Sequence, residues 1–264
     1  MTKPVCYDTF VVKNKKLGVD YFSLTFGPYP KIGACRPGHF IQLKLPNSSV
    51  FLRRPMSVAG AVPKYKGMEI IFKVVGQGSF SMSRLRVGDP VNILGPLGVP
   101  FKFPRRNETA ILVAGGAGLP PMLFLAESLV SQGFDPKRIL FYYGGRTSTD
   151  IIMRTRIKRL GIHFYPVTED GSFGLKGLVT EPLEEKLDSA GIENPNLFSC
   201  GPQGMLKAVN ELGLKYGVSG QISLEAHMPC GIGMCLGCVV PLTRGGHARV
   251  CTDGPVFEIG EVEL

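Results

Sequence analysis

The stretch Met228-Pro229-Cys230-Gly231-Ile232-Gly233-Met234-Cys235-Leu236-Gly237-Cys238 lies near the end of the chain, and a further cysteine follows at Cys251. Four residues separate the first two cysteines, two separate the next pair, and a longer gap leads to Cys251. This is the spacing of four thiolates that hold a [2Fe-2S] cluster. The intervening glycines permit positive φ and let backbone amides approach the sulfurs. We therefore expect Cys230, Cys235, Cys238 and Cys251 to be cluster ligands.

Two other uses of these cysteines fit the pattern less well. Structural zinc sites usually combine two short Cys-x-x-Cys pairs, whereas only Cys235 and Cys238 are that close here. Disulfides suit oxidising compartments, and the start of the sequence has no apolar run of the secretory kind. We therefore expect a cytoplasmic protein. Away from the cluster, Cys6 and Cys35 are expected to be ordinary small apolar side chains.

Length and charge narrow the class of protein. The 264 residues suffice for about two domains or one large one. No apolar run reaches the roughly 18–20 residues of a membrane helix, so no membrane association is expected. The net charge of +9 could serve nucleic acid, an acidic partner or anionic cofactors. Because the basic residues are scattered and not interleaved with aromatic residues, we expect no nucleic-acid binding.

The first hundred residues alternate short β-rich runs with glycine, proline and asparagine, which predicts an antiparallel barrel or sandwich. One short helix is expected over Gly78–Leu85. In Arg53-Arg54-Pro55-Met56-Ser57, an arginine beside a proline can present paired donors to a phosphate. In Gly76-Gln77-Gly78-Ser79, glycine amides precede a helix, where anions bind. Taken alone, each motif also fits an ordinary strand or turn.

The order of the two motifs along the chain and their separation in sequence resemble those of the flavin-binding domain of the ferredoxin-reductase superfamily. The resemblance implies that the barrel binds FAD. Arg54 would contact phosphate or flavin, and Ser57 would lie near the reactive edge of the flavin. Gly78 and Ser79 would hold the pyrophosphate. The other implied flavin contacts are Pro55, Met56, Ile71, Phe72 and Lys73.

Strands and helices alternate from Glu108 onward, which predicts a parallel sheet with crossover helices. The strand Thr109–Ala114 runs into a glycine-rich turn, and a helix is expected from about Met122 to Gln132. Ligands bind at the carboxyl ends of such strands. The turn is not a G-x-G-x-x-G fingerprint, because Pro121 occupies the place of its third glycine.

Two motifs of this region strengthen the resemblance to the same superfamily. Its members carry a Gly-Gly-x-Gly-x-x-Pro turn at this place, and their last strand ends in Cys-Gly-Pro-x-x-Met. Both patterns occur here, the second with Cys200 at the strand end. The family role of this cysteine is to lie near the nicotinamide ring, and a buried thiol is the alternative. The implied nicotinamide-cofactor residues are Gly115, Gly116, Gly118, Cys200 and Gly201.

Charged side chains bear on the choice between NAD and NADP. Glu169 and Asp170 follow a later strand of this region. Carboxylates beside the adenosine ribose would accept a hydrogen bond from a 2′-hydroxyl and repel a 2′-phosphate. They favour NAD, whereas Arg146 argues for NADP. We expect NAD.

The tail completes a multi-domain α+β fold. A small hairpin is expected from Val239–Thr243 and Ala248–Val250, and His227 and His247 are expected to be surface or loop residues. The predicted domains are an antiparallel β-barrel FAD domain (1–105), an α/β parallel-sheet nucleotide domain (106–222) and a small C-terminal [2Fe-2S] cluster domain (223–264).

This domain order, together with the cysteine loop and the later Cys-x-Asp-Gly-Pro-Val-Phe, resembles the electron-transfer subunit of two-subunit, NAD-linked dihydroorotate dehydrogenase. The resemblance covers essentially the whole chain. Related subunits occur in NADH-dependent ferredoxin:NADP oxidoreductases and sulfide dehydrogenases, where the first cluster ligand is commonly an aspartate. Cys230 at that position favours the dihydroorotate family.

The resemblance implies a role in pyrimidine biosynthesis. Electrons would pass from the FMN of a separate catalytic subunit through [2Fe-2S] and FAD to NAD⁺, in an α₂β₂ assembly. No catalytic side-chain constellation stands out, which suits a protein whose cofactors carry the chemistry. The alternatives left open are a stand-alone NADH-to-acceptor reductase, a redox sensor that uses the cluster as a switch, and a zinc-bearing structural protein.

Overall fold

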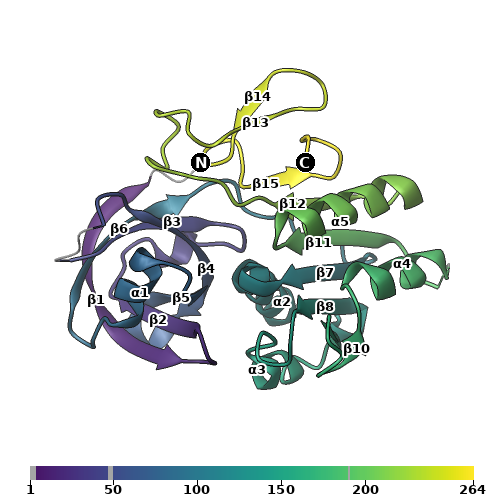
Figure 1. The fold of residues 1–264 in the computed structure, drawn as a ribbon, viewed down its shortest axis with the longest axis horizontal. Coiled ribbons are helices and arrows are strands. Elements are labelled where there is room, and N and C mark those ends of the chain that lie inside the picture. The colour runs from purple at the N-terminus through teal and green to yellow at the C-terminus, as the bar shows by residue number, and fades with distance from the viewer. Residues whose placement is uncertain (1–3, 47–49, 190) are drawn as a thin grey trace.

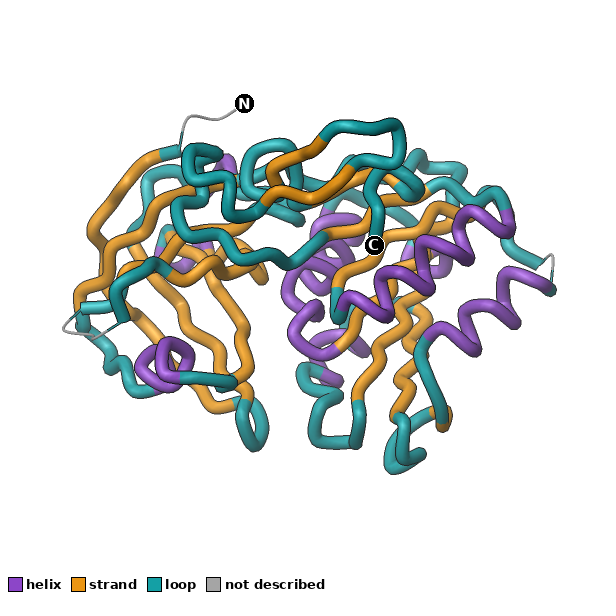
Figure 2. The backbone as a smooth tube through the Cα atoms, turned by 45° about the horizontal axis from the view of Figure 1, so that its top comes forward, coloured by secondary structure: helices purple, strands orange, loops and turns teal. Residues whose placement is uncertain are grey.

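A computed structural model describes residues 4–46, 50–189 and 191–264 (Figure 1). A barrel and a layered α/β unit lie side by side, and the C-terminal segment lies across the top of both in this view. Figure 2 shows the same arrangement from a second direction. No helix in the described part of the chain is long and apolar enough to cross a membrane.

The barrel is closed by six antiparallel strands in the order β1-β2-β5-β4-β3-β6, which confirms the expected barrel. The strands are β1 Val5–Lys16, β2 Tyr21–Gly27, β3 Phe40–Lys44, β4 Arg54–Val62, β5 Gly67–Lys73 and β6 Pro90–Leu97. Helix α1 (Gln77–Ser83) follows β5, close to its expected place. Two short 3-10 helices, η1 (Ile32–Ala34) and η2 (Pro63–Tyr65), join barrel strands.

Strand β5 forms part of the face that the barrel turns toward the α/β unit. Successive side chains of a strand point to opposite faces. Ile70 lies in the barrel core, whereas Ile71 packs in the core of the α/β unit. Glu69 and Lys73 share the face of Ile71, and both form ion pairs with that unit.

The α/β unit is built on a seven-stranded sheet in the order β10-β9-β8-β7-β11-β12-β15, parallel except at β15. Its strands are β7 Thr109–Gly115, β8 Ile139–Gly145, β9 His163–Thr168, β10 Leu175–Lys176, β11 Pro195–Cys200, β12 Gly220–Ser223 and β15 Val256–Glu258. Its helices are η3 Gly116–Gly118, α2 Leu119–Ser131, η4 Pro136–Arg138, α3 Arg154–Lys158, α4 Thr180–Asp188 and α5 Gln203–Tyr216. The expected parallel sheet is confirmed.

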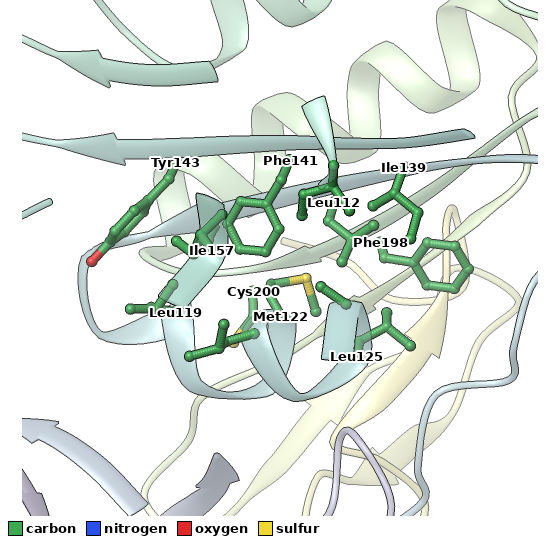
Figure 3. Close-up of a cluster of buried hydrophobic side chains, with 14 of the residues drawn as sticks. Leu112, Leu119, Met122, Leu125, Ile139, Phe141, Tyr143, Ile157, Phe198 and Cys200 are labelled. Carbon is green, nitrogen blue, oxygen red and sulfur yellow. The ribbon is translucent and has the colours of Figure 1, made fainter. Parts of the chain in front are cut away.

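The core of this unit lies between the sheet and α2. Side chains of the central strands, such as Leu112, Phe141 and Phe198, meet Met122 and Leu125 of α2 (Figure 3). The helix begins at Leu119 instead of Met122. Prolines are tolerated in the first turn of a helix, where their missing amides would have no intrahelical partner, so the two prolines after Leu119 do not delay its start.

The tail forms the expected hairpin from β13 (Val239–Pro241) and β14 (His247–Arg249). Its last strand, β15, was not expected to extend the sheet of the α/β unit, yet it pairs antiparallel with β12. The tail is therefore joined to that unit through backbone hydrogen bonds. The domain boundaries 1–105, 106–222 and 223–264 remain predictions.

Two cysteines outside the cluster loop differ in exposure. Cys35 is buried, as expected of a small apolar side chain. The same expectation is wrong for Cys6, which is exposed and has its sulfur near Asn92 and Arg53. Cys6 lies on β1, where alternate side chains face the solvent.

Candidate functional site

A cavity of about 340 Å³ lies where the barrel, the α/β unit and the tail meet. We call it the flavin cavity, after the predicted residues that line it. These are Pro55, Met56 and Ser57 of β4 and Ile71, Phe72 and Lys73 of β5. Cys200 at the end of β11 and Met228 of the tail also line it. The fold thus brings the predicted flavin contacts of two paired strands, β4 and β5, to one cavity.

The two predicted phosphate-binding motifs also meet. The side chain of Arg54 lies so close to Gly78 that a Cβ built there would be 2.7 Å from Arg54 Cδ. Arg53 is used differently, because its guanidinium donates to the carbonyls of Gln42 and Asn92. The guanidinium of Arg54 has no hydrogen bond to the described residues, which suits it for an anionic ligand.

Ser79 is engaged within its own turn. Its hydroxyl accepts hydrogen bonds from the amides of Val75 (2.9 Å) and Gly76 (3.1 Å) and donates to the carbonyl of Gly76 (3.0 Å). These bonds fix the backbone that leads into α1. The predicted contact of Ser79 with a pyrophosphate remains a prediction.

A second cavity, of about 700 Å³, opens at the carboxyl ends of the parallel strands. We call it the dinucleotide cavity, because it is lined by Gly115 and Gly116, whose contact with a nicotinamide cofactor remains a prediction. Arg146 and Glu169 line it as well. Asp170 is not among its lining residues and accepts hydrogen bonds from the amide and hydroxyl of Ser172.

Three further predicted residues have other positions. Gly118 allows close packing, since a Cβ there would be 2.1 Å from the carbonyl oxygen of Cys200. Cys200 lines the flavin cavity and not the dinucleotide cavity. Burial raises the pKa of its thiol, which keeps it protonated. Gly201 packs against Met205. The nicotinamide roles of Gly118, Cys200 and Gly201 remain predictions.

The two cavities adjoin. Lys73, Val75 and Ala117 line both of them. Two residues that the sequence analysis did not single out, Tyr21 and Asp150, line the dinucleotide cavity beside Lys73. Asp150 lies just beyond the carboxyl end of β8, and this place in the strand pattern could have indicated it. Two flat ring systems could therefore meet at the shared wall.

The cysteine loop pairs its thiols. Cys235 influences the acidity of Cys230, and Cys238 influences that of Cys251, so the four thiols act on one another as two pairs. Within the described residues, no three His, Cys, Asp or Glu side chains converge on a position for one metal ion. Two pairs of thiols suit the two irons of a [2Fe-2S] cluster, which four cysteines hold.

Backbone amides of the cysteine loop donate hydrogen bonds to the cysteine sulfurs. The amides of Ile232, Gly233 and Gly237 point to the sulfurs of Cys230, Cys251 and Cys235 at 3.5, 3.2 and 3.4 Å. Gly233 has a φ of +79°, which residues with a Cβ rarely adopt. The loop residues therefore fit a cluster whose sulfurs accept hydrogen bonds.

The thiols differ in acidity. Burial opposes ionisation of Cys230, but hydrogen bonds from the amide of Ile232 and from Cys235 lower its pKa to about 6. Burial, with a hydrogen bond to Cys238, raises the pKa of Cys251 to about 12. A thiol that coordinates a metal is deprotonated outright. Iron bound at Cys251 would therefore displace a proton at neutral pH.

The flavin cavity and the cysteine loop are neighbours along the chain. Met228 lines the cavity, and Cys230 lies two residues further on. Two residues span at most about 7 Å. Gln42, buried in β3, donates from Nε2 to the carbonyl of Met228 at 2.6 Å and so holds this connection against the barrel.

Families with known functions match two parts of the chain. Residues 225–263 match the iron-sulfur cluster binding domain of dihydroorotate dehydrogenase B, and residues 112–211 match the oxidoreductase NAD-binding domain. A dihydroorotate dehydrogenase B (NAD(+)) electron transfer subunit of Shouchella clausii (strain KSM-K16) is 34% identical over 260 residues, 96% of each chain. The chain belongs to the family of dihydroorotate dehydrogenase B electron transfer subunits.

A second family member, from Bacillus mycoides (strain KBAB4), is 37% identical over 235 residues, 86% of this chain and 87% of that protein. These matches confirm the expected family. With the flavin-reductase fold of the solved neighbours, they also confirm the expected cofactors, FAD, a [2Fe-2S] cluster and NAD.

Solved structures extend the likeness. A chain from an NADH-dependent reduced ferredoxin-NADP oxidoreductase superposes with a TM-score of 0.84 at 29% identity, over 97% of this chain and 89% of that chain. The ferredoxin reductase in carbazole 1,9a-dioxygenase superposes with a TM-score of 0.67 at 22% identity, over 81% and 67% of the two chains. The second likeness shows the shared fold alone.

Proposed function

We propose that this chain carries electrons between a dihydroorotate dehydrogenase catalytic subunit and NAD⁺, in pyrimidine biosynthesis. One observation carries the proposal: the dinucleotide cavity, the flavin cavity and the cysteine loop form a continuous series. Lys73, Val75 and Ala117 join the first two, and Met228 joins the second to Cys230. This order matches a path from nicotinamide through flavin to iron–sulfur.

Individual residues have distinct tasks in this proposal. Arg54 binds FAD phosphate, Gly78 leaves room for it, and Ser79 fixes the turn beneath it. The walls of the flavin cavity orient the flavin ring and exclude water from it. Gly115 and Gly116 let the dinucleotide approach the backbone. The cluster ligands are Cys230, Cys235, Cys238 and Cys251.

The chemistry belongs to the bound groups. FAD exchanges one or two electrons, so it links hydride transfer with NAD to single-electron transfer through the cluster. The role of the protein in this proposal is to arrange the cofactor sites next to each other. Gln42 holds the cluster loop against the barrel. Its backbone amides stabilise negative charge on the cluster sulfurs.

The partner in this proposal is an FMN-containing catalytic subunit, in an α₂β₂ assembly in the cytoplasm. The cysteine loop exposes an apolar surface made of Ile232, Met234 and Leu236, with exposed fractions of 42%, 78% and 61%. Exposed apolar patches mark interaction sites. This surface, which we call the loop crown, would place the cluster at the subunit interface.

Purification of the chain from its native cells under anaerobic conditions tests the proposal. We expect a roughly equimolar FMN-bearing barrel protein of about 250 residues or more to accompany it. The isolated complex should reduce NAD⁺ with dihydroorotate. A complex without this activity would contradict the proposal.

A second candidate function rests on the superposition with the chain of the ferredoxin-NADP oxidoreductase structure, at a TM-score of 0.84. In that case a larger flavin and iron–sulfur protein would accompany the chain. Copurification of no partner would instead favour a self-sufficient NADH reductase. The same experiment therefore separates all three outcomes.

Replacing Met234 by glutamate is expected to weaken binding of the partner. Met234 is the most exposed apolar residue of the loop crown, and a buried charge at an interface costs affinity. We expect Kd to rise by about tenfold or more, with the cluster spectrum unchanged. The matched control is Val87→Glu, in the turn before β6, where the side chain is 69% exposed. Equal Kd values for both variants, measured by calorimetry, would exclude the loop crown from the interface.

A further inference from the structure

The wall shared by the flavin and dinucleotide cavities contains an ion pair between two domains. Lys73 ends β5 of the barrel, and Asp150 follows β8 of the α/β unit. The Lys73 Nζ and the Asp150 Oδ1 are 2.8 Å apart. The two side chains are 32% and 12% exposed. Lys73 lines both cavities, and Asp150 lines the dinucleotide cavity, so the ion pair lies where the two cavities adjoin.

The carboxylate of Asp150 is fixed from several sides. Its Oδ1 also accepts a hydrogen bond from the Tyr21 hydroxyl at 3.2 Å, and its Oδ2 accepts one from the amide of Arg146 at 3.2 Å. The hydroxyl of Tyr143 donates to the backbone carbonyl of Asp150 at 2.8 Å. Both domains supply these donors, so Asp150 has little freedom to move.

Lys73 is held in turn. Its Nζ lies 5.0 Å from the centre of the Tyr21 ring, which favours a cation over the ring face. Tyr21 is only 3% exposed. Burial opposes the charge of Asp150, but the hydrogen bond and charge of Lys73 lower the pKa of the carboxyl below its ordinary value. The Asp150 carboxyl is therefore ionised at neutral pH.

We infer that Asp150 is a positioning residue for hydride transfer, which holds the Lys73 ammonium beside the junction of flavin and nicotinamide. The inference rests on the proposed use of the two cavities by FAD and NAD. A fixed cation there stabilises negative charge on a neighbouring reduced flavin without reorganising during the reaction. The ion pair also fixes the barrel relative to the α/β unit at the place where the flavin and nicotinamide rings would approach each other.

The experiment compares Asp150→Asn and Lys73→Met with the wild-type chain loaded with FAD. Reduction of FAD by NADH is followed under anaerobic conditions, and the flavin midpoint potential is measured separately. We expect Asp150→Asn to slow reduction by about tenfold or more, since small misplacements of reacting groups cost up to about 100-fold. Lys73→Met should shift the midpoint potential to a more negative value, because a cation near the flavin is lost.

Glu69→Gln is the matched control. Glu69 also joins β5 to the α/β unit, through Arg156, but it lines neither the flavin nor the dinucleotide cavity. We expect FAD reduction in this variant to stay within about twofold of the wild type, because its contact is remote from the reacting groups. Equally slow FAD reduction in Glu69→Gln would mean that Asp150 only holds the two domains together. That result would overturn the inference.

Exchanging the two charges tests whether the location of the ammonium matters, or only the presence of an ion pair. In the double variant Lys73→Asp, Asp150→Lys the ion pair is retained but the ammonium lies on the other domain. We expect its melting temperature to recover relative to Asp150→Asn, while FAD reduction stays slow. Recovery of both would overturn the inference. If NADH fails to reduce the wild-type protein, the proposed function falls with it, whereas normal reduction in Asp150→Asn contradicts the inference alone.

Discussion

Replacing Cys235 by serine is expected to break electron transfer to the catalytic partner while NADH still reduces FAD. Serine is a poor substitute for a thiolate that binds iron. Loss of an outer-shell partner of a metal already costs about 10- to 100-fold, so loss of a ligand should cost more than about 100-fold. Cys235 is the exposed member of the four, so its replacement perturbs packing least. Dihydroorotate-dependent NAD⁺ reduction by the reconstituted complex measures the loss.

The control for this variant is Cys6→Ser. Cys6 is also an exposed cysteine, but it lies on β1 of the barrel and outside the cysteine loop. We expect its complex to couple dihydroorotate oxidation to NAD⁺ reduction at the wild-type rate. Coupling at the native rate in Cys235→Ser would show that electrons do not pass through this cluster.

Most of the fold was predictable from local sequence patterns. The cysteine spacing predicted the iron–sulfur segment, and the match of residues 225–263 to a cluster-binding domain confirms it. Strand-and-turn spacing predicted the barrel, and strand-and-helix alternation predicted the parallel sheet. In each of these cases the signal lies within a few neighbouring residues, where backbone preference and burial pattern act together.

Contacts between distant segments were harder to foresee. Strand β15 is three residues long and has too few positions to show an alternation, so its addition to the sheet of the α/β unit was missed. Asp150 was missed for another reason. Its partner Lys73 is 77 positions away and belongs to another domain, so no local pattern joins them.

In the candidate site, too, local motifs were predictable from the sequence, whereas the contacts between them were not. Arg54 and Gly78 were chosen from separate motifs, and the structure brings them together. Glu169 and Asp170 were expected to act alike, but only Glu169 lines the dinucleotide cavity. A turn can direct two adjacent side chains to opposite sides, and the sequence does not show which of them faces the ligand.

Replacing Arg156 by methionine is expected to destabilise the junction between barrel and α/β unit. Arg156 lies on α3 and binds Glu127 of α2 at 2.5 Å and Glu69 of β5 at 2.6 Å. Burial opposes its charge, but the hydrogen bonds and charges of Glu127 and Glu69 raise the pKa of Arg156 above its ordinary value. Without the guanidinium, two carboxylates would face each other unpaired.

The size of the effect follows from exposure. Breaking a fully buried pair costs about 3–5 kcal/mol, and here Arg156 is 30% exposed, Glu69 12% and Glu127 26%. We therefore expect a loss of roughly 2–3 kcal/mol in the free energy of unfolding, after a discount for solvent screening. For a chain of this size the melting temperature should fall by roughly 4–12 °C.

Calorimetry of Arg156→Met beside Lys102→Met provides the comparison. Lys102 pairs with Glu258 at 2.8 Å, but these side chains are 77% and 49% exposed. Exposed pairs contribute little because water and salt screen them, so this control should lose less than about 1 kcal/mol. Adding Glu69→Gln and Glu127→Gln to Arg156→Met should recover part of the loss, since the unpaired charges are then removed. Equal melting temperatures for Arg156→Met and the wild type would mean that the ion pairs of Arg156 do not stabilise the junction between the two units.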